Sequence, residues 1–225
     1  MTQRSTLLPS IATMRRRTLL RSAALTLPLA ACARKTAWHE TDISGAMPRL
    51  SFAMTDAMTG SQVTAADFRG KVTLLYFGYT QCPDYCPTTL TNLAAVLHNL
   101  GKQADRVRIL FVTVDPNRDS LPILKHYAAL FAPQMVGLRG TPDELASLAR
   151  RYRVAYSVTP ARNGHPYAVT HSAIVYVFDQ SGNARLIIAA MATPRPDIGG
   201  TTADLRRLID NGGAPSLLDR IERIV

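Results

Sequence analysis

Two cysteines lie four positions apart in the stretch Phe77–Pro87, which reads F-G-Y-T-Q-C-P-D-Y-C-P. Cys82 and Cys86 are each followed by a proline, and the stretch comes directly after an apolar run. Sulfurs at this spacing can form a structural disulfide, exchange disulfides with a partner, or bind a metal ion. A structural disulfide is the weakest explanation, because it would close too short a loop to stabilise the fold appreciably.

The N-terminus predicts that the cysteines reach an oxidising compartment. The first 31 residues hold five arginines and no acidic residue and end in an apolar segment, as secretory signal peptides do. The segment Arg16–Arg21 (R-R-T-L-L-R) is similar to the twin-arginine export pattern, and Leu29–Cys32 (L-A-A-C) resembles a lipobox. We therefore expect a signal peptide over 1–31 and lipid on Cys32; an ordinary signal peptide with a chance cysteine is the alternative. The two cysteines of the motif are then the only thiols left.

The charge of the chain argues against a nucleic-acid partner. The formal net charge is +10, but five of the 26 Lys and Arg residues and no acidic residue lie in the signal, so the mature chain carries +5. No DNA-reading motif and no basic cluster interleaved with aromatic residues accompanies this charge, so we expect no nucleic acid as partner. Removing 31 of 225 residues leaves 194, enough for one substantial core. We predict a tether over 32–49 and a single domain over 50–225.

Hydrophobic periodicity predicts alternating strands and helices. Near-continuous apolar runs predict buried strands at 72–78 and 107–114, and apolar residues at helical spacing predict a helix from Leu90 to Leu100 that Gly101 ends. Further elements are expected as strands at 50–55, 172–178 and 185–190, and as helices at 119–131, after the capping box T-P-D-E (141–144), at 204–209 and at 217–224. Residues 152–170 show no clear period and are expected as a long functional loop. This order predicts an α/β, thioredoxin-like fold, with a central mixed sheet and helices on both faces.

The predicted topology brings a third group to the cysteines. Cys82 and Cys86 follow the carboxyl end of a parallel strand, and a strand of opposite direction begins at that same edge. His171, directly before that antiparallel strand, is therefore expected to reach the sulfurs. Asp84, between the cysteines, and Asp115, at the end of the neighbouring parallel strand, are expected on the rim of the site. Alternatively, Asp84 is a solvated turn residue, and Asp115 is a cap or anchor of the following helix.

The three expected donors suit copper. Pro87 favours Cys86 at the N-cap of the following helix, where the dipole would lower the thiol pKa, so we expect two thiolates beside one imidazole. This is a soft, low-coordinate set, and Cu(I) accepts two or three ligands. Zinc normally takes a fourth protein ligand, and no other thiol remains to supply it. Of the other histidines, His98 and His126 are expected to be structural. His39 and His165 are expected to contact copper only transiently, if they contact it.

At these residues the sequence resembles the Sco/SenC family of copper-binding assembly factors for cytochrome c oxidase. The matching segments are the cysteine motif extended to Leu90, V-D-P-N-R-D-S at 114–120, Y-S-V-T-P at 156–160 and H-S-A-I-V-Y-V-F-D at 171–179. The resemblance implies that Cys82, Cys86 and His171 bind one copper ion and pass it to the dinuclear copper centre of oxidase subunit II. Family members often carry Asp directly before the histidine. Here it is Thr170, which leaves an extra oxygen ligand or imidazole partner in question.

The resulting hypothesis is a lipid-anchored copper metallochaperone on the periplasmic side of a bacterial membrane, rather than an enzyme. It would exchange copper, as Cu(I) or Cu(II), with the thiolates of a partner. Because oxidation of the cysteine pair to a disulfide removes two ligands, we also expect a periplasmic thiol reductant as a partner. The alternative is a thiol-disulfide oxidoreductase, which would use the same cysteines without the histidine as a ligand.

Overall fold

The computed structural model describes residues 37–162, 164–165 and 167–212. Three predicted features lie outside these ranges: the signal peptide over 1–31, the lipidation site at Cys32 and the terminal helix at 217–224. Among the helices that are described, none has both the length and the apolarity needed to cross a membrane.

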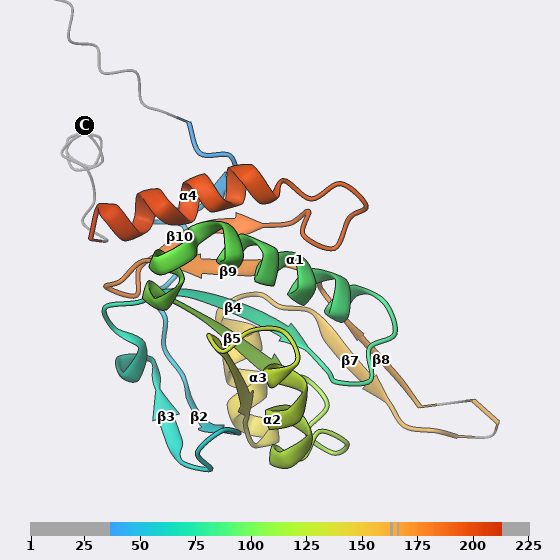
Figure 1. The fold of residues 1–225 in the computed structure, drawn as a ribbon. Helices are drawn as coiled ribbons and strands as arrows, with labels where there is room; N and C mark the ends of the chain where they lie inside the picture. Colours follow the sequence, from blue (N-terminus) through green and yellow to red (C-terminus); the bar gives the residue numbers. More distant parts are fainter. Residues whose placement is uncertain (1–36, 163, 166, 213–225) are drawn as a thin grey trace, which may run out of the picture. The chain divides into compact units, whose positions relative to one another are not determined.

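An eight-stranded sheet is the centre of the fold, in the order β1-β10-β9-β4-β5-β6-β2-β3 (Figure 1). Its strands are β1 Thr41–Asp42, β2 Ala53–Asp56, β3 Gln62–Thr64, β4 Val72–Gly78, β5 Val107–Thr113, β6 Met135–Arg139, β9 Val175–Phe178 and β10 Ala184–Ile188. Strands β4, β5 and β6 run parallel, and every residue of β4 is buried, which explains its continuous apolar run. Strand β9 returns antiparallel beside β4, so the predicted mixed sheet is confirmed.

The helices follow the connections between the strands. They are α1 Tyr85–Leu100, α2 Leu121–Ala129, α3 Pro142–Arg151 and α4 Ile198–Asp210, with short 3-10 turns at Ala65–Phe68 and Gly101–Arg106. The connections from β4 through α1 to β5, and from β5 through α2 to β6, step in the same direction across the sheet. Because such crossovers are right-handed, α1 and α2 lie on the same face. Helix α4 packs beside α1 (Figure 1).

Aromatic contacts confirm that helices cover both faces. Tyr76 of β4 packs on Phe111 of β5, and Phe111 packs on Tyr127 of α2, with ring centroids 6.1 and 5.4 Å apart. Tyr152, directly after α3, packs on Phe178 of β9 at 5.4 Å. Phe178 pairs with Thr73 of β4, so these two side chains lie on the same face of the sheet. Because side chains alternate along a strand, Tyr76, three residues after Thr73, lies on the opposite face. Helix α3 therefore covers the face that α1 and α2 leave open.

Local signals set several element boundaries as predicted. Thr141 caps α3 and Glu144 returns the hydrogen bond, so the capping box is confirmed. Gly101 ends α1 with a positive φ of 58°, a conformation that glycine adopts without a steric penalty. The strand predicted at 72–78 coincides with β4, and the one predicted at 107–114 is one residue longer than β5.

The part of the predicted tether that the structure describes is bound to the sheet and to α4. Strand β1 pairs with β10, and Asp204 of α4 accepts hydrogen bonds from the two backbone N–H groups that follow Trp38, at 2.9 and 2.8 Å. The guanidinium of Arg207 lies over the Trp38 ring at 3.9 Å. Residues 38–49 therefore belong to the folded domain, because their backbone groups and the indole find partners there.

A second, two-stranded sheet occupies part of the region that we predicted as a loop. Strands β7 (Tyr156–Thr159) and β8 (Ala168–His171) pair antiparallel, and Figure 1 shows this hairpin projecting away from the main sheet. The prediction of an irregular loop over 152–170 is therefore wrong for these strands. The strand predicted from 172 begins at Val175, so His171 ends β8 and does not directly precede β9.

Candidate metal centre

The loop between β4 and α1 carries the first cysteine and leads into the second. The backbone N–H of Cys82 donates to the carbonyl of Tyr79 at 3.2 Å, which closes a turn. Helix α1 begins directly after its N-cap, Asp84, so Cys86 is the second residue of the helix. The prediction that Cys86 is the N-cap is therefore wrong. Pro87 then occupies the third position, where a proline is tolerated because N–H groups of the first turn have no partner within the helix. The Cys86 side chain is fully buried, whereas Cys82 is 9% exposed.

A buried carboxylate holds this loop against the end of β5. Asp119, which is 0% exposed, accepts hydrogen bonds from the backbone N–H and hydroxyl of Thr80, at 3.0 and 2.6 Å. It also accepts one from the hydroxyl of Thr113 at 2.6 Å. No role was predicted for Asp119 from the sequence, although it lies in the V-D-P-N-R-D-S segment at 114–120. Its side chain connects the metal-site loop to the strand beside it.

His171 reaches the cysteines from the hairpin. Its Nε2 lies 3.3 Å from the Sγ of Cys86. Its Nδ1 lies 3.0 Å from the backbone oxygen of Ser172, which can only accept, so Nδ1 carries the proton and Nε2 keeps its lone pair. The ring stands edge-on against Tyr79 and Tyr76, with centroids 5.7 and 6.1 Å away. These contacts orient the imidazole with its free nitrogen toward the sulfurs.

The predicted convergence of the three side chains is confirmed. The donor atoms of Cys82, Cys86 and His171 all lie within 4.8 Å of one another, although 85 residues separate the second cysteine from the histidine. Within the described ranges no other group of three or more His, Cys, Asp or Glu side chains comes together in this way. Two sulfurs and one imidazole nitrogen form a donor set that fits copper.

Asp115 lies apart from this group of donors and anchors the hairpin. Its carboxylate is 0% exposed and accepts hydrogen bonds from the Nε of Arg118 and from the hydroxyl of Tyr167, the latter at 2.7 Å. The Arg118 guanidinium also lies over the Tyr167 ring at 4.0 Å. Tyr167 directly precedes β8, so these contacts connect the loop after β5 to the strand that carries His171.

Asp84 and Thr170 also lie outside the donor group. Asp84 is exposed, and its side chain makes no hydrogen bond that caps α1. The hydroxyl of Thr170 shares a hydrogen bond of 2.7 Å with Ser157 on an exposed part of the hairpin. The remaining histidines are likewise absent from the donor group: His39, which lies 3.6 Å from Asp197, and the exposed His98, His126 and His165.

The two thiols share a proton unequally. A hydrogen bond from the Cys86 thiol holds the pKa of Cys82 well below its usual range, and backbone N–H groups contribute further. The same hydrogen bond and burial together raise the pKa of Cys86. The expectation of two low-pKa sulfurs is therefore wrong for Cys86, because burial and its hydrogen bond outweigh the helix dipole.

This asymmetry predicts which thiol reacts first in the metal-free, reduced chain. Iodoacetamide should alkylate Cys82 before Cys86, with a rate that changes little between about pH 8 and about pH 5, because Cys82 stays a thiolate across this range. An ordinary thiol with a pKa of about 8.5 would slow about tenfold per pH unit below that value. Mass spectrometry of the alkylated peptides measures both rates. Cys86→Ala removes the hydrogen-bond donor and should restore an ordinary pH dependence at Cys82. Equal alkylation of both cysteines would contradict the assignment.

Gly78, the last residue of β4, makes room for the Cys86 sulfur. A Cβ at this position would lie 2.6 Å from the Sγ of Cys86 and 2.6 Å from the Cε2 of Phe111, which is closer than real Cβ contacts. We expect Gly78→Ala to lower the free energy of unfolding of the metal-free chain by about 1–3 kcal/mol, through overpacking. Urea denaturation measures this. Gly199→Ala, where the nearest atom is 3.8 Å away on the exposed first turn of α4, is the matched control and should not destabilise. Equal stability of both variants would rule out the steric role.

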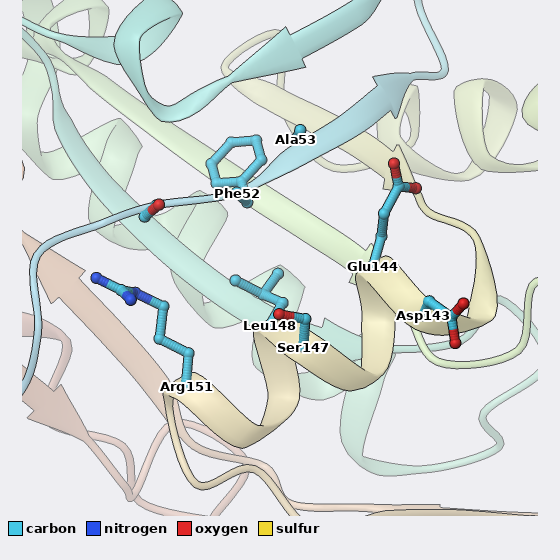
Figure 2. Close-up of a pocket in the computed structure, with 8 residues that line it drawn as sticks. Phe52, Ala53, Asp143, Glu144, Ser147, Leu148 and Arg151 are labelled. Atoms are coloured by element: carbon cyan, nitrogen blue, oxygen red, sulfur yellow. The ribbon is translucent and has the colours of Figure 1, made fainter.

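A groove of about 540 Å³ lies elsewhere, between α3 and the start of β2 (Figure 2). It is lined by Ser51, Phe52, Ala53, Asp143, Glu144, Ser147, Leu148 and Arg151. Two of its charged groups have local structural partners: Glu144 completes the capping box of α3, and Arg151 donates to the backbone oxygen of Arg49. None of the three converging donors lines this groove, which therefore adds nothing to the metal centre.

The SCO1/SenC family profile matches residues 44–209, which is most of the chain. The chain belongs to the SCO1/SenC family. Among curated members of this family, the chain is 36% identical over 160 residues to the mouse mitochondrial SCO2 homolog, covering 68% of this chain and 63% of that protein. It is 39% identical over 127 residues to yeast mitochondrial SCO1, covering 56% of this chain and 43% of that protein. The chain spans about half the length of the curated relatives that it matches.

Solved structures of the SCO1/SenC family share the fold over nearly their whole length. The structure of Bradyrhizobium japonicum ScoI with copper bound is 38% identical, with a TM-score of 0.62, and the match covers 71% of this chain and 98% of that one. The solution structure of apo Sco1 from Thermus thermophilus is 32% identical, with a TM-score of 0.66, covering 76% and 97%. Yeast Sco1 with copper bound is 31% identical, with a TM-score of 0.61, covering 78% and 95%. The predicted thioredoxin-like α/β fold is confirmed.

Proposed function

We propose that this chain is a copper metallochaperone that binds one copper ion through Cys82, Cys86 and His171. The observation that carries the proposal is the convergence of the three donor atoms within 4.8 Å. Copper-bound relatives from Bradyrhizobium and yeast, at 38% and 31% identity, support copper as the cargo. Thiolate ligands favour Cu(I), and a three-donor site suits this ion better than zinc, which normally takes four protein ligands.

The arrangement of the donors suits transfer by ligand exchange. Cys86 is fully buried and Cys82 is 9% exposed, so a partner's thiolate can reach the ion from the side of Cys82. His171 is carried by the hairpin, outside the main sheet. The Cys82 side of the site would exchange its ligands first, while the more deeply buried sulfur of Cys86 retains the ion until the partner has supplied its own donors.

The destination and location follow from the family resemblance and from the N-terminal sequence. We infer that the copper goes to the dinuclear centre of cytochrome c oxidase subunit II, and that a periplasmic thiol reductant keeps the cysteines reduced. We infer further that the signal over 1–31 directs the chain to the periplasmic side of a bacterial membrane, where lipid on Cys32 anchors it.

Lipidation at Cys32 makes a prediction for membrane association. We expect Cys32→Ser to move the exported chain from the membrane fraction to the soluble fraction of the periplasm, because no lipid would hold it. Cell fractionation followed by immunoblotting measures the distribution, and Cys82→Ser is the control that should stay in the membrane fraction. A Cys32→Ser chain that remains membrane-bound would exclude this anchor.

A thiol-disulfide oxidoreductase remains the second candidate function, and one specific observation favours it. The low pKa of Cys82 beside the raised pKa of the buried Cys86 resembles the division of an exchange pair into an attacking thiolate and a resolving thiol. Such chemistry would be balanced by oxidation of the cysteine pair to a disulfide as the partner's disulfide is reduced to two thiols.

Copper stoichiometry on the purified, reduced chain tests the leading proposal. We expect one equivalent of copper to bind to the wild-type chain and tight binding to be lost in Cys82→Ser and in Cys86→Ser, because each change removes a soft donor. Elemental analysis after gel filtration measures the bound metal. Asp84→Asn, which changes an exposed residue between the cysteines, is the control and should retain the full equivalent. A reduced wild-type chain that binds no copper but reduces disulfides would decide for the oxidoreductase.

A further inference from the structure

Tyr76 is a buried tyrosine of β4 whose hydroxyl points at a metal-site sulfur. The hydroxyl donates a hydrogen bond to the Sγ of Cys86 at 3.7 Å, within the range for sulfur acceptors. The residue is 0% exposed, and its ring lies 6.1 Å from Phe111 on one side and 6.1 Å from His171 on another. Packed in this way, the hydroxyl cannot turn to solvent, so the sulfur serves as its acceptor in the interior.

Other hydroxyls of the described residues are buried without any hydrogen-bond partner. They belong to Tyr127, in the same aromatic stack as Tyr76, and to Ser172, next to His171. Loss of such a group removes no hydrogen bond. Tyr76 differs because its hydroxyl is bonded to one of the three donor atoms.

We propose that Tyr76 tunes the bound copper, favouring Cu(I) over Cu(II) through its hydrogen bond to the Cys86 sulfur. The inference rests on the proposed function, since it requires copper on that sulfur. Hydrogen bonds to cysteine sulfur are a known control of the potential of copper–thiolate sites. The thiolate carries more negative charge when the ion is Cu(I), so a donor stabilises that state more. The same bond lowers the energy of the sulfur lone pairs, which raises the energy of sulfur-to-Cu(II) charge transfer.

Tyr76→Phe tests the proposal because it keeps the ring and removes only the hydroxyl. In the full chain carrying one equivalent of copper, we expect the ratio of Cu(I) to Cu(II) affinity to fall about tenfold. For one electron, this tenfold change corresponds to a midpoint potential lower by about 59 mV. The charge-transfer absorption of the Cu(II) form should move to longer wavelength. Spectroelectrochemical titration measures both quantities.

Tyr127→Phe is the matched control. It removes a buried hydroxyl from the same aromatic stack without removing a hydrogen bond to sulfur, so its potential and spectrum should equal those of the wild-type chain. An unshifted potential in Tyr76→Phe, or an equal shift in Tyr127→Phe, would overturn the inference.

A second measurement keeps the test independent of how well the variant folds. In the wild-type Cu(II) form, the Cu–S stretching frequency in resonance Raman spectra should shift when the solvent is changed to D2O, because a hydroxyl proton on the sulfur exchanges. The absence of this shift would also overturn the inference. A wild-type chain that binds no copper would instead overturn the proposed function and the inference with it, so the two failures are distinguishable.

Discussion

Replacing His171 with alanine is expected to lower the affinity of the reduced chain for Cu(II) by at least about 100-fold. This loss should exceed the one that follows when a residue that only supports a ligand is replaced. The change removes the single nitrogen donor of the group while both sulfurs remain. Affinity for Cu(I) should fall less, because Cu(I) accepts two ligands and two thiolates can still supply them. Competition titrations against a chelator of known affinity, made separately for each oxidation state, measure the two losses.

The control for this prediction is His98→Ala, which makes the same change at an exposed residue in the last turn of α1. It should leave both affinities unchanged. A wild-type affinity for Cu(II) in His171→Ala would remove the imidazole from the site. The same variant separates the two candidate functions, since an oxidoreductase would keep its disulfide-reducing rate without His171, whereas a metallochaperone would lose copper transfer.

A second large effect is expected at Asp119, this time on stability. Asp119→Ala leaves the backbone N–H and hydroxyl of Thr80 and the hydroxyl of Thr113 without their acceptor. Hydrogen bonds to a buried charged group are individually stronger than neutral ones, and an unsatisfied buried donor is costly. We expect the free energy of unfolding to fall by about 3–5 kcal/mol, which urea denaturation of the metal-free chain measures.

Two further variants show whether the effect at Asp119 arises from these hydrogen bonds. Asp105→Ala removes an exposed carboxylate and should change stability by no more than about 0.5 kcal/mol. Thr80→Val removes one of the three hydrogen bonds and should lie between the wild-type chain and Asp119→Ala. A loss in Asp119→Ala no larger than that in Asp105→Ala would show that the carboxylate does not hold the metal-site loop.

The hairpin shows where reading the sequence failed. Strands β7 and β8 are four residues each, and their half-buried, alternating pattern is too short to stand out from an irregular segment. Each strand is stabilised by pairing with the other, and by the contacts of Asp115 and Arg118 with Tyr167, directly before β8. His171 was still placed correctly beside the sulfurs, because the direction of β9 alone determines at which edge the preceding chain arrives.

Elements whose signals are local, and the sheet edge at which they meet, could be predicted along the chain. The buried runs of β4 and β5, the capping box at Thr141 and the order of strands and helices were enough to predict the fold and to bring Cys82, Cys86 and His171 together. These features depend on periodicity, on turn chemistry and on the constant handedness of crossovers, all of which can be read along the chain.

The groups that surround the three donors could be identified only in the folded chain. The proton on Cys86, the hydrogen bond from Tyr76, the loop anchor at Asp119 and the hydrogen bonds from the backbone of His39 and Glu40 to Asp204 could not be read from the sequence. Each depends on burial and on a partner that the fold brings within hydrogen-bonding distance, across as many as 165 residues in the case of Asp204. Burial and partner identity are non-local properties, so they arise only when the whole core has packed.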